Sequence, residues 1–157
     1  MTHSDDFDGP EILRDNVPYL IHRIGRLMDQ TIDPYLKEQN FSIEMCRVLF
    51  VLSEVGHYNL VALSDATSVK TSTLSRLVGR MVQRGLVSRS RSDTDNRTAN
   101  VAILPPGQKM IDILMPRMAE IWEMSKQNFS PEELPLLTTY LRRLLQTVSK
   151  NGLKTED

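Results

Sequence analysis

Apolar residues recur at spacings of three and four between Lys70 and Arg84, and this pattern predicts an amphipathic helix. Its buried stripe would consist of Leu74, Leu77, Val78 and Met81, and Gly85 would end the helix in a left-handed conformation. A shorter helical pattern precedes it at residues 61–66, where Val61, Leu63 and Ala66 are available for a core. Small polar residues between the two patterns indicate a tight turn.

After Gly85 the period of the pattern changes from about 3.6 to 2, which is typical of half-buried strands. Residues 86–91 and 98–103 alternate in this way, and a polar, turn-forming segment at 92–97 separates them. Helix, turn, helix and hairpin is the order of a winged helix-turn-helix. The second helix of that motif commonly enters the major groove of DNA.

Long apolar stripes flank this region on both sides. The stripe before it predicts a helix that is interrupted near Pro34, because a proline disfavours a helical conformation at the preceding Asp33. Its members are Val17, Leu20, Ile21, Ile24, Leu27, Met28 and Ile32. Ser42 is a suitable N-cap for the next helix, which Gly56 would end.

Beyond the hairpin, a helix beginning at Pro105 or Pro106 would continue through Pro116, and Ser130 would cap a final helix. The apolar stripe of that final helix comprises Leu134, Leu137, Leu141, Leu144 and Val148. The terminal helices carry more apolar surface than a lobe at 41–104 needs, and an unpaired stripe invites a partner. Two-fold pairing is one interpretation, and a monomer with internally packed terminal helices is the other.

The predicted fold is mainly α with a small β wing, and it combines a winged helix-turn-helix lobe with a helical dimerisation region built from both termini. The expected organisation is a disordered tail at 1–9, an N-terminal dimerisation helix at 10–40, the DNA-binding lobe at 41–104, C-terminal dimerisation helices at 105–150 and a tail at 151–157.

Basic side chains concentrate in the central region. From Lys70 to Arg97 there are seven basic and two acidic side chains, a local net charge of +5, whereas the whole chain has a net charge of −1. A cationic face inside a near-neutral chain is expected of a protein that neutralises phosphates. The alternative is a solvated run of charges without a nucleic-acid partner.

Four segments resemble the MarR (multiple antibiotic resistance regulator) family of transcription factors. They are the runs 72–78 and 81–87, the wing sequence from Arg91 to Arg97, and Leu104 with Gly107. The resemblance implies a homodimeric repressor of a pseudo-palindromic operator, in which Arg97 enters the minor groove and Asp95 orients it. This chain departs from the family pattern at Asn96, where a second Arg is common, and at Lys70-Thr71, which replaces Ser-Pro.

The resemblance and the helical pattern together give the candidate interface with double-stranded DNA. Its major-groove residues are Lys70, Thr71, Ser72, Thr73, Ser75 and Arg76, and its backbone contacts are Arg80, Arg89 and Arg91. The resemblance also implies a small aromatic or acidic effector, for which His22 and Arg26, with Met45 and Cys46, are the candidates.

Other classes of site lack residues in a suitable arrangement. The scattered His residues and Cys46 have no metal-ligand spacing, no nucleophile and base can be paired, and no glycine-rich loop could hold a phosphate. We therefore expect neither an enzyme nor a cofactor. Gly79 costs helix stability, and close packing is the only reason that the sequence suggests for it.

Cys46 has two interpretations, a small, half-buried core residue or a redox-sensing thiol in the first turns of a helix. The MarR-like peroxide sensors tend to carry their reactive Cys in the first helix, where this chain has none. A single Cys, no apolar run of membrane-spanning length and no signal-peptide pattern predict a cytoplasmic protein that has no membrane partner. A winged helix that binds only proteins remains the alternative function.

Overall fold

The computed structural model describes residues 10–91 and 99–151. The chain divides into two compact units, Met1–Met118 and Ala119–Asp157, and the boundary falls within α5. The expected tails and the wing loop with Asp95, Asn96 and Arg97 lie outside the described residues. The described part has six helices and a three-stranded antiparallel sheet, so the predicted fold class is confirmed.

The first unit begins with a short 3-10 turn, Glu11–Leu13, and then α1, Val17–Glu38. The prediction of an interruption near Pro34 is wrong, since α1 continues through this proline. Burial of Ile32 and Leu36, which are 4% and 0% exposed, holds the helix on both sides of the proline. Packing of these side chains outweighs the lost backbone hydrogen bond.

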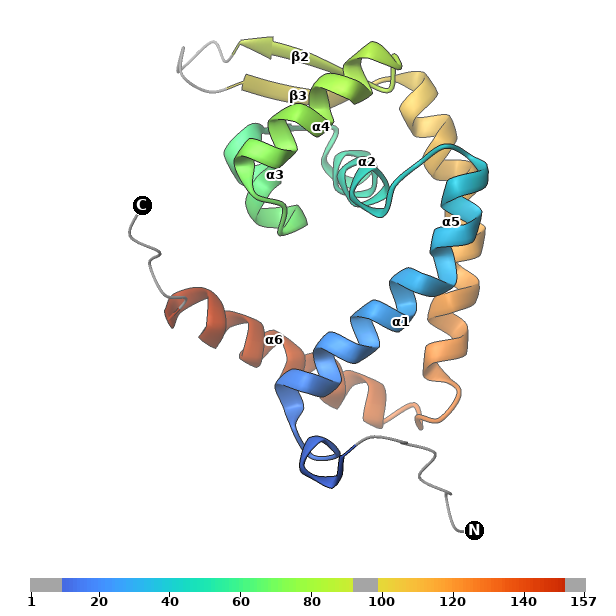
Figure 1. Cartoon of the computed structure of the whole chain (residues 1–157), viewed down its shortest axis with the longest axis vertical. Helices are drawn as coiled ribbons and strands as arrows, with labels where there is room; N and C mark the ends of the chain where they lie inside the picture. The colour runs from blue at the N-terminus through green and yellow to red at the C-terminus, as the bar shows by residue number, and fades with distance from the viewer. Residues whose placement is uncertain (1–9, 92–98, 152–157) are drawn as a thin grey trace. The chain divides into compact units, whose positions relative to one another are not determined.

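The central lobe consists of α2 (Ile43–Val55), β1 (His57–Asn59), α3 (Leu60–Thr67), α4 (Thr71–Gln83), β2 (Val87–Arg91) and β3 (Ala99–Ile103). Figure 1 shows α2, α3 and α4 gathered beside the hairpin of β2 and β3. The two predicted strands are confirmed, and the strand order is β1-β3-β2. Strand β1 was not expected, because three residues are too few to show an alternating pattern.

Helix ends in this lobe follow local chemistry. Ser42 Oγ accepts a hydrogen bond from Met45 N at 3.3 Å, which confirms it as the N-cap of α2. Gly56 and Gly85 follow the ends of α2 and α4 with φ of 77° and 66°, a conformation that favours glycine. Asn16 and Asn59 cap α1 and α3 in the same way as Ser42, and neither cap was expected.

The core of the lobe lies where α2, α3 and α4 meet the sheet. The predicted stripe of α4 is buried in full: Leu74, Leu77, Val78 and Met81 are at most 2% exposed. In α3 the buried side chains are Leu60, Leu63 and Thr67, so the expectation for Val61 and Ala66 was wrong. The buried face differs from the predicted one because α3 begins at Leu60 and because Thr67, whose hydroxyl donates to Leu63 O, is buried.

Helix α5, Pro105–Lys126, begins in the first unit and passes through Pro116. The second unit contains the end of α5 and helix α6, Glu133–Asn151. Ser130 and Glu133 form a reciprocal capping box before α6: Ser130 N donates to Glu133 Oε2 at 2.7 Å, and Glu133 N donates to Ser130 Oγ at 3.3 Å. The predicted cap at Ser130 is therefore confirmed.

Candidate nucleic-acid interface

The turn between α3 and α4 is fixed by side-chain hydrogen bonds. Ser68 takes the left-handed conformation with φ 56°, and Val69 is buried beside it. Ser64 Oγ donates to Val69 O at 2.7 Å, and Thr71 Oγ1 donates to Ser64 Oγ at 3.0 Å. The Thr71 hydroxyl proton is therefore used to brace the turn, which holds the start of α4 against α3.

The first turn of α4 has no side-chain cap. Lys70 occupies the N-cap position and makes no capping hydrogen bond. The amides at such a helix end carry a partial positive charge and bind anions, phosphates among them. Lys70 is unfavourable as an N-cap, and it thus leaves the amides at the start of α4 available to an external anion.

Helix α4 presents its polar residues to solvent. Its candidate residues Lys70, Thr71, Ser72, Thr73, Arg76 and Arg80 are exposed, and Ser75 is half-buried. No described residue forms an ion pair with Lys70, Arg76 or Arg80. From residue 70 to residue 91 the chain contains no Asp or Glu, so the positive charge of this surface is not neutralised by its own segment.

Strand β2 adds a further cation to the same surface. The Arg89 guanidinium is exposed and donates from Nη1 to Ser75 Oγ at 3.4 Å. This hydrogen bond joins the hairpin to the exposed side of α4, as the shared interface requires. Arg91 ends β2, and its side chain is outside the described part of the chain, as are Asp95 and Arg97.

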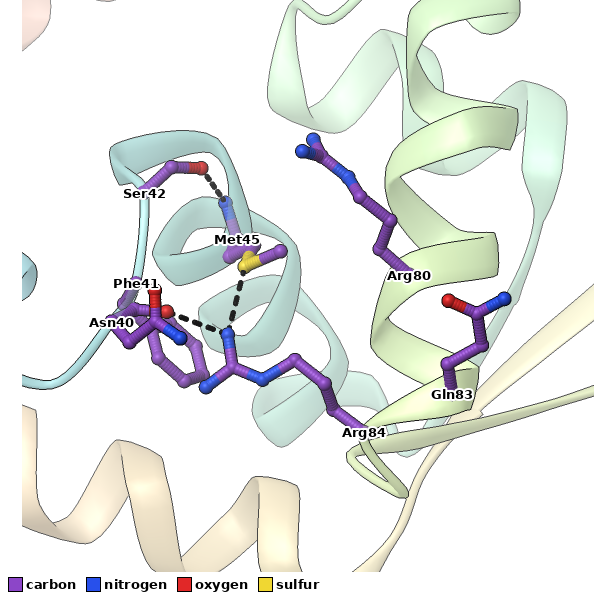
Figure 2. Close-up of a pocket in the computed structure, with 7 residues that line it drawn as sticks. All are labelled: Asn40, Phe41, Ser42, Met45, Arg80, Gln83 and Arg84. Atoms are coloured by element: carbon purple, nitrogen blue, oxygen red, sulfur yellow. Dashed lines mark hydrogen bonds between the residues drawn. The ribbon is translucent and has the colours of Figure 1, made fainter.

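A cavity of about 420 Å³ lies between the start of α2 and the last turns of α4. Asn40, Phe41, Ser42, Met45, Arg80, Gln83 and Arg84 line it (Figure 2). Arg84 was predicted only as part of the local positive charge, and Phe41 and Gln83 were not among the predicted site residues. The four-residue spacing of Arg80 and Arg84 was the available signal, since it places both on one side of a helix.

The four candidate effector residues do not share one cavity. His22 and Arg26 line a pocket of about 400 Å³ on α1, together with Tyr19, Arg23 and Leu27. Met45 lines the cavity beside α4 instead. Cys46 lines neither of these two pockets.

Cys46 is a core residue, only 1% exposed. Its thiol donates to Met118 Sδ at 3.8 Å. Burial raises the pKa of the Cys46 thiol, and the charge of Arg47 opposes that rise only in part. A buried thiol held in the neutral form is a poor nucleophile, so the geometry favours the structural interpretation over redox sensing.

Within residues 10–91 and 99–151, no three His, Cys, Asp or Glu side chains come together in a way that could hold a metal ion. No helix there is long and apolar enough to cross a membrane.

Comparison with known proteins places the chain among transcription regulators. Residues 41–99 match the model of the MarR family. The chain is 26% identical to the HTH-type transcriptional repressor IacR of Pseudomonas putida, over 90% of this chain and 83% of that protein. It is also 26% identical to the organic hydroperoxide resistance transcriptional regulator of Bacillus subtilis, over 89% of this chain and 94% of the other.

Solved structures agree with these relatives. The crystal structure of a MarR family transcriptional regulator from Silicibacter pomeroyi superimposes with a TM-score of 0.80 at 26% identity and covers 90% of this chain and 95% of that one. The MarR protein from Peptoclostridium difficile has the same fold, with a TM-score of 0.83 at 20% identity over 94% and 97% of the two chains. The lobe, its exposed cationic helix and these matches together identify residues 41–99 as a DNA-binding winged helix-turn-helix domain of the MarR family of transcriptional regulators.

Proposed function

We propose that this protein binds a pseudo-palindromic DNA operator as a homodimer and acts in the cytoplasm as a repressor. The observation that carries the proposal is the exposed side of α4, which combines an uncapped helix start, cations that form no ion pair with a described residue, and a link to Arg89 of β2. Lys70, Thr71, Ser72, Thr73, Ser75 and Arg76 face the major groove. Arg80, Arg89 and Arg91 hold the phosphate backbone, and Arg97, oriented by Asp95, enters the minor groove.

The homodimer is supported by exposed apolar side chains on α6. Leu137, Leu141, Leu144 and Val148 recur at helical spacing and are 37%, 45%, 37% and 60% exposed. Apolar area of this kind on a surface helix marks a protein–protein interface. A two-fold dimer sets the two recognition helices about one DNA turn apart, ~34 Å, and so reads two half-sites of opposite orientation.

Repression and its release by an effector extend what is known of relatives. IacR and NicR of Pseudomonas putida are named as transcriptional repressors, and the structure of Bordetella bronchiseptica BpsR concerns regulation of its DNA binding by 6-hydroxynicotinic acid. We assign the pocket of His22 and Arg26 on α1 to a small aromatic or acidic effector, because Arg26 supplies a cation for a carboxylate. Binding there would favour a dimer geometry in which the two α4 helices no longer fit one operator.

The test begins with the DNA that the purified full chain retains from a fragmented genome, sequenced to define the operator. Fluorescence anisotropy then measures operator affinity between 50 and 200 mM salt. Neutralising 6 to 10 phosphates lowers affinity by about 10³ to 10⁵ over that range. Absence of any enriched DNA, or an affinity that is insensitive to salt, contradicts the proposal and favours a winged helix that binds only proteins.

A further inference from the structure

Arg84 joins the ends of two helices that lie far apart in the chain. It is the C-cap residue of α4, and its side chain reaches the segment between α1 and α2 (Figure 2). Nη1 donates to Asn40 O at 2.6 Å and lies 3.6 Å from Met45 Sδ, and the guanidinium carbon stands 4.6 Å from the centre of the Phe41 ring. Together these contacts form the Arg84 bridge. An exposed side chain is thus held in one geometry by a hydrogen bond and a ring contact.

The end of α1 is fixed where the bridge meets it. Asn40 takes the left-handed conformation with φ 53°, and its N donates to Lys37 O at 2.9 Å. Phe41 N donates to Leu36 O at 2.8 Å. This pair of hydrogen bonds is a Schellman motif, which closes the last turn of a helix. Because Leu36 and Phe41 are 0% and 5% exposed, the motif is anchored in the core, and the carbonyl that accepts from Arg84 has a fixed position.

The end of α4 is built in the same way. Gly85 has φ 66° and donates from N to Val82 O at 2.9 Å, and Leu86 N donates to Met81 O at 3.0 Å. Met81 and Leu86 are buried, so this second Schellman motif is also anchored in the core. The carbonyl groups at a helix end carry a partial negative charge, which favours a guanidinium between two such ends. The Arg84 bridge therefore connects two fixed helix ends.

The two ends of α4 are held by different helices. Thr71 braces the start of α4 against α3, and Arg84 holds its end to the end of α1. Helix α4 has 13 residues and is therefore about 20 Å long. A change of about 5° in its direction moves one end by about 1.7 Å relative to the other, whereas hydrogen-bond distances vary by only about 0.5 Å. The contacts of a recognition helix with base edges thus depend on both attachments.

We propose that Arg84 is a positioning residue for DNA recognition, which fixes the direction of α4 relative to α1 without itself binding DNA. The inference rests on the proposed function, because operator binding is the activity that the bridge serves. A cation–π contact at an exposed site corresponds to about a twofold to fivefold preference for the bridged geometry. Loss of the bridge should therefore lower the affinity of one lobe for a half-site about threefold, and that of a dimer for the operator about tenfold, because a dimer loses two bridges.

The first test compares Arg84→Lys with the wild type by fluorescence anisotropy on the operator, on a single half-site and on unrelated DNA. Lysine keeps the charge but lacks the planar group that contacts Phe41 and donates to Asn40. Arg47→Lys is the matched control, because Arg47 of α2 binds Asp29 of α1 and has no described hydrogen bond to α4. Its operator affinity should stay within about twofold of the wild type, the range of a neutral surface substitution.

For Arg84→Lys we expect the losses given above on the operator and the half-site, with the affinity for unrelated DNA and the slope of log affinity against log salt unchanged. A residue that only stabilised the fold would leave the affinity of the folded chain as it is. Wild-type operator affinity in Arg84→Lys overturns the proposal. An equal loss on operator and unrelated DNA also overturns it, because that pattern is the mark of a contact with the phosphate backbone.

Phe41→Leu tests the bridge from its other side. Phe41 is buried and lies outside the predicted DNA-binding residues, and leucine keeps apolar bulk while removing the face of the ring. This variant should lose as much operator affinity as Arg84→Lys, and the double variant should lose no more than either single one, because both changes remove the same interaction. Additive losses would mean that the two residues act independently, contrary to the proposal.

Hydrogen exchange followed by mass spectrometry measures the bridge without DNA, and it does not depend on whether Phe41→Leu folds. In Arg84→Lys the amides of Asn40 and Phe41 should exchange faster than in the wild type, because the Asn40 carbonyl is no longer held, whereas Arg47→Lys should exchange at the wild-type rate. Unchanged exchange in Arg84→Lys overturns the bridge. A wild type that retains no DNA refutes the proposed function and the role of Arg84 with it, whereas wild-type operator binding by Arg84→Lys refutes the positioning role alone.

Discussion

Gly107 lies where the first turn of α5 crosses the backbone at the end of α4. A Cβ atom at this position would stand 2.2 Å from Leu86 O and 3.1 Å from Ile103 Cγ1. Leu86 O also accepts from Leu104 N at 3.0 Å, so it cannot move without losing that hydrogen bond. Only glycine allows the hairpin, α4 and α5 to meet this closely.

We therefore expect Gly107→Ala to lower the free energy of unfolding by about 1 to 3 kcal/mol, the usual cost of overpacking. Urea unfolding followed by far-UV circular dichroism measures the change. An unfolding free energy equal to that of the wild type would mean that α5 shifts freely away from Leu86, contrary to this account.

Gly79 offers the opposite case within α4. A Cβ atom there meets nothing within 4 Å in the described structure, so the close packing suggested by the sequence does not explain this glycine. Because alanine favours a helix over glycine, Gly79→Ala should raise the free energy of unfolding by about 0.5 to 1 kcal/mol. The same urea experiment applies, with Gly25→Ala of α1, which is also unobstructed, as its control. Destabilisation by Gly79→Ala alone would reveal a contact that the described residues do not contain.

Cys46 allows a prediction about reactivity and pH. Because burial raises the pKa of its thiol, the unfolded chain loses the proton at a lower pH than the folded chain. The stabilising contribution of the neutral thiol is complete below the unfolded pKa of about 8.5 and declines as pH rises above it. We expect iodoacetamide at pH 8 to alkylate the native thiol at least tenfold more slowly than the urea-unfolded one, as measured by mass spectrometry. Equal rates would restore the redox interpretation.

Some features of single residues could be predicted from the sequence, and others could not. The buried stripe of α4 and the glycines after α2 and α4 were predictable, because helical spacing and left-handed φ depend on local chemistry. The obstruction at Gly107 was not, because Leu86 O comes from a segment 21 positions away in the chain. The bracing of Thr71 by Ser64 escaped prediction for the same reason, since it needs the α3–α4 turn to be folded first.

At the scale of helices and strands, the residues that cap helix starts follow local chemistry, whereas the continuation of a helix through a proline depends on tertiary packing. Asn16 and Asn59 are good caps, and their side chains accept from amides three residues later, yet neither was recognised before the structure. Pro34 was given too much weight, because the burial of Ile32 and Leu36 is a tertiary effect. Strand β1 exists only through its pairing with β3, where Tyr58 lies opposite Val101.

The wing gives a prediction at this scale. The hairpin of β2 and β3 leads to the segment carrying Arg97, and Arg89 already joins β2 to α4 through Ser75. We expect Arg97→Ala to weaken operator binding by about 1 to 3 kcal/mol, the size of one good arginine contact, in a gel-shift titration. Arg14→Ala, an exposed cation before α1, should leave affinity unchanged. Wild-type affinity in Arg97→Ala would remove the wing from DNA recognition.

At the scale of the whole molecule, the sequence predicted a cationic surface on the central lobe and apolar stripes on the terminal helices. The lobe buries its apolar side chains around α4, whereas α6 in the second unit exposes most of its own. Periodicity identified the α6 stripe correctly but could not say what covers it, since a buried face and an exposed face have the same spacing. Measurement of the assembled state distinguishes a second copy of this chain from another partner.

Leu141 lies near the middle of the α6 stripe and is 45% exposed, so a charge there should disrupt pairing without entering the core of the DNA-binding lobe. We expect Leu141→Glu to sediment as a monomer at micromolar concentration, where the wild type sediments as a dimer, because an interface core does not tolerate an unpaired carboxylate. Its operator affinity should fall at least tenfold while affinity for a single half-site stays within twofold, since each lobe keeps its own α4.

Gln146→Glu adds the same charge to α6 away from the stripe and should remain dimeric, which separates loss of pairing from a general charge effect. If Leu141→Glu stays dimeric, or if it becomes monomeric and still binds the full operator with wild-type affinity, pairing through α6 is not what places the two recognition helices. The apolar stripe would then require a different partner, and the spacing of half-sites in the recovered DNA would no longer be set by a symmetric dimer of this chain.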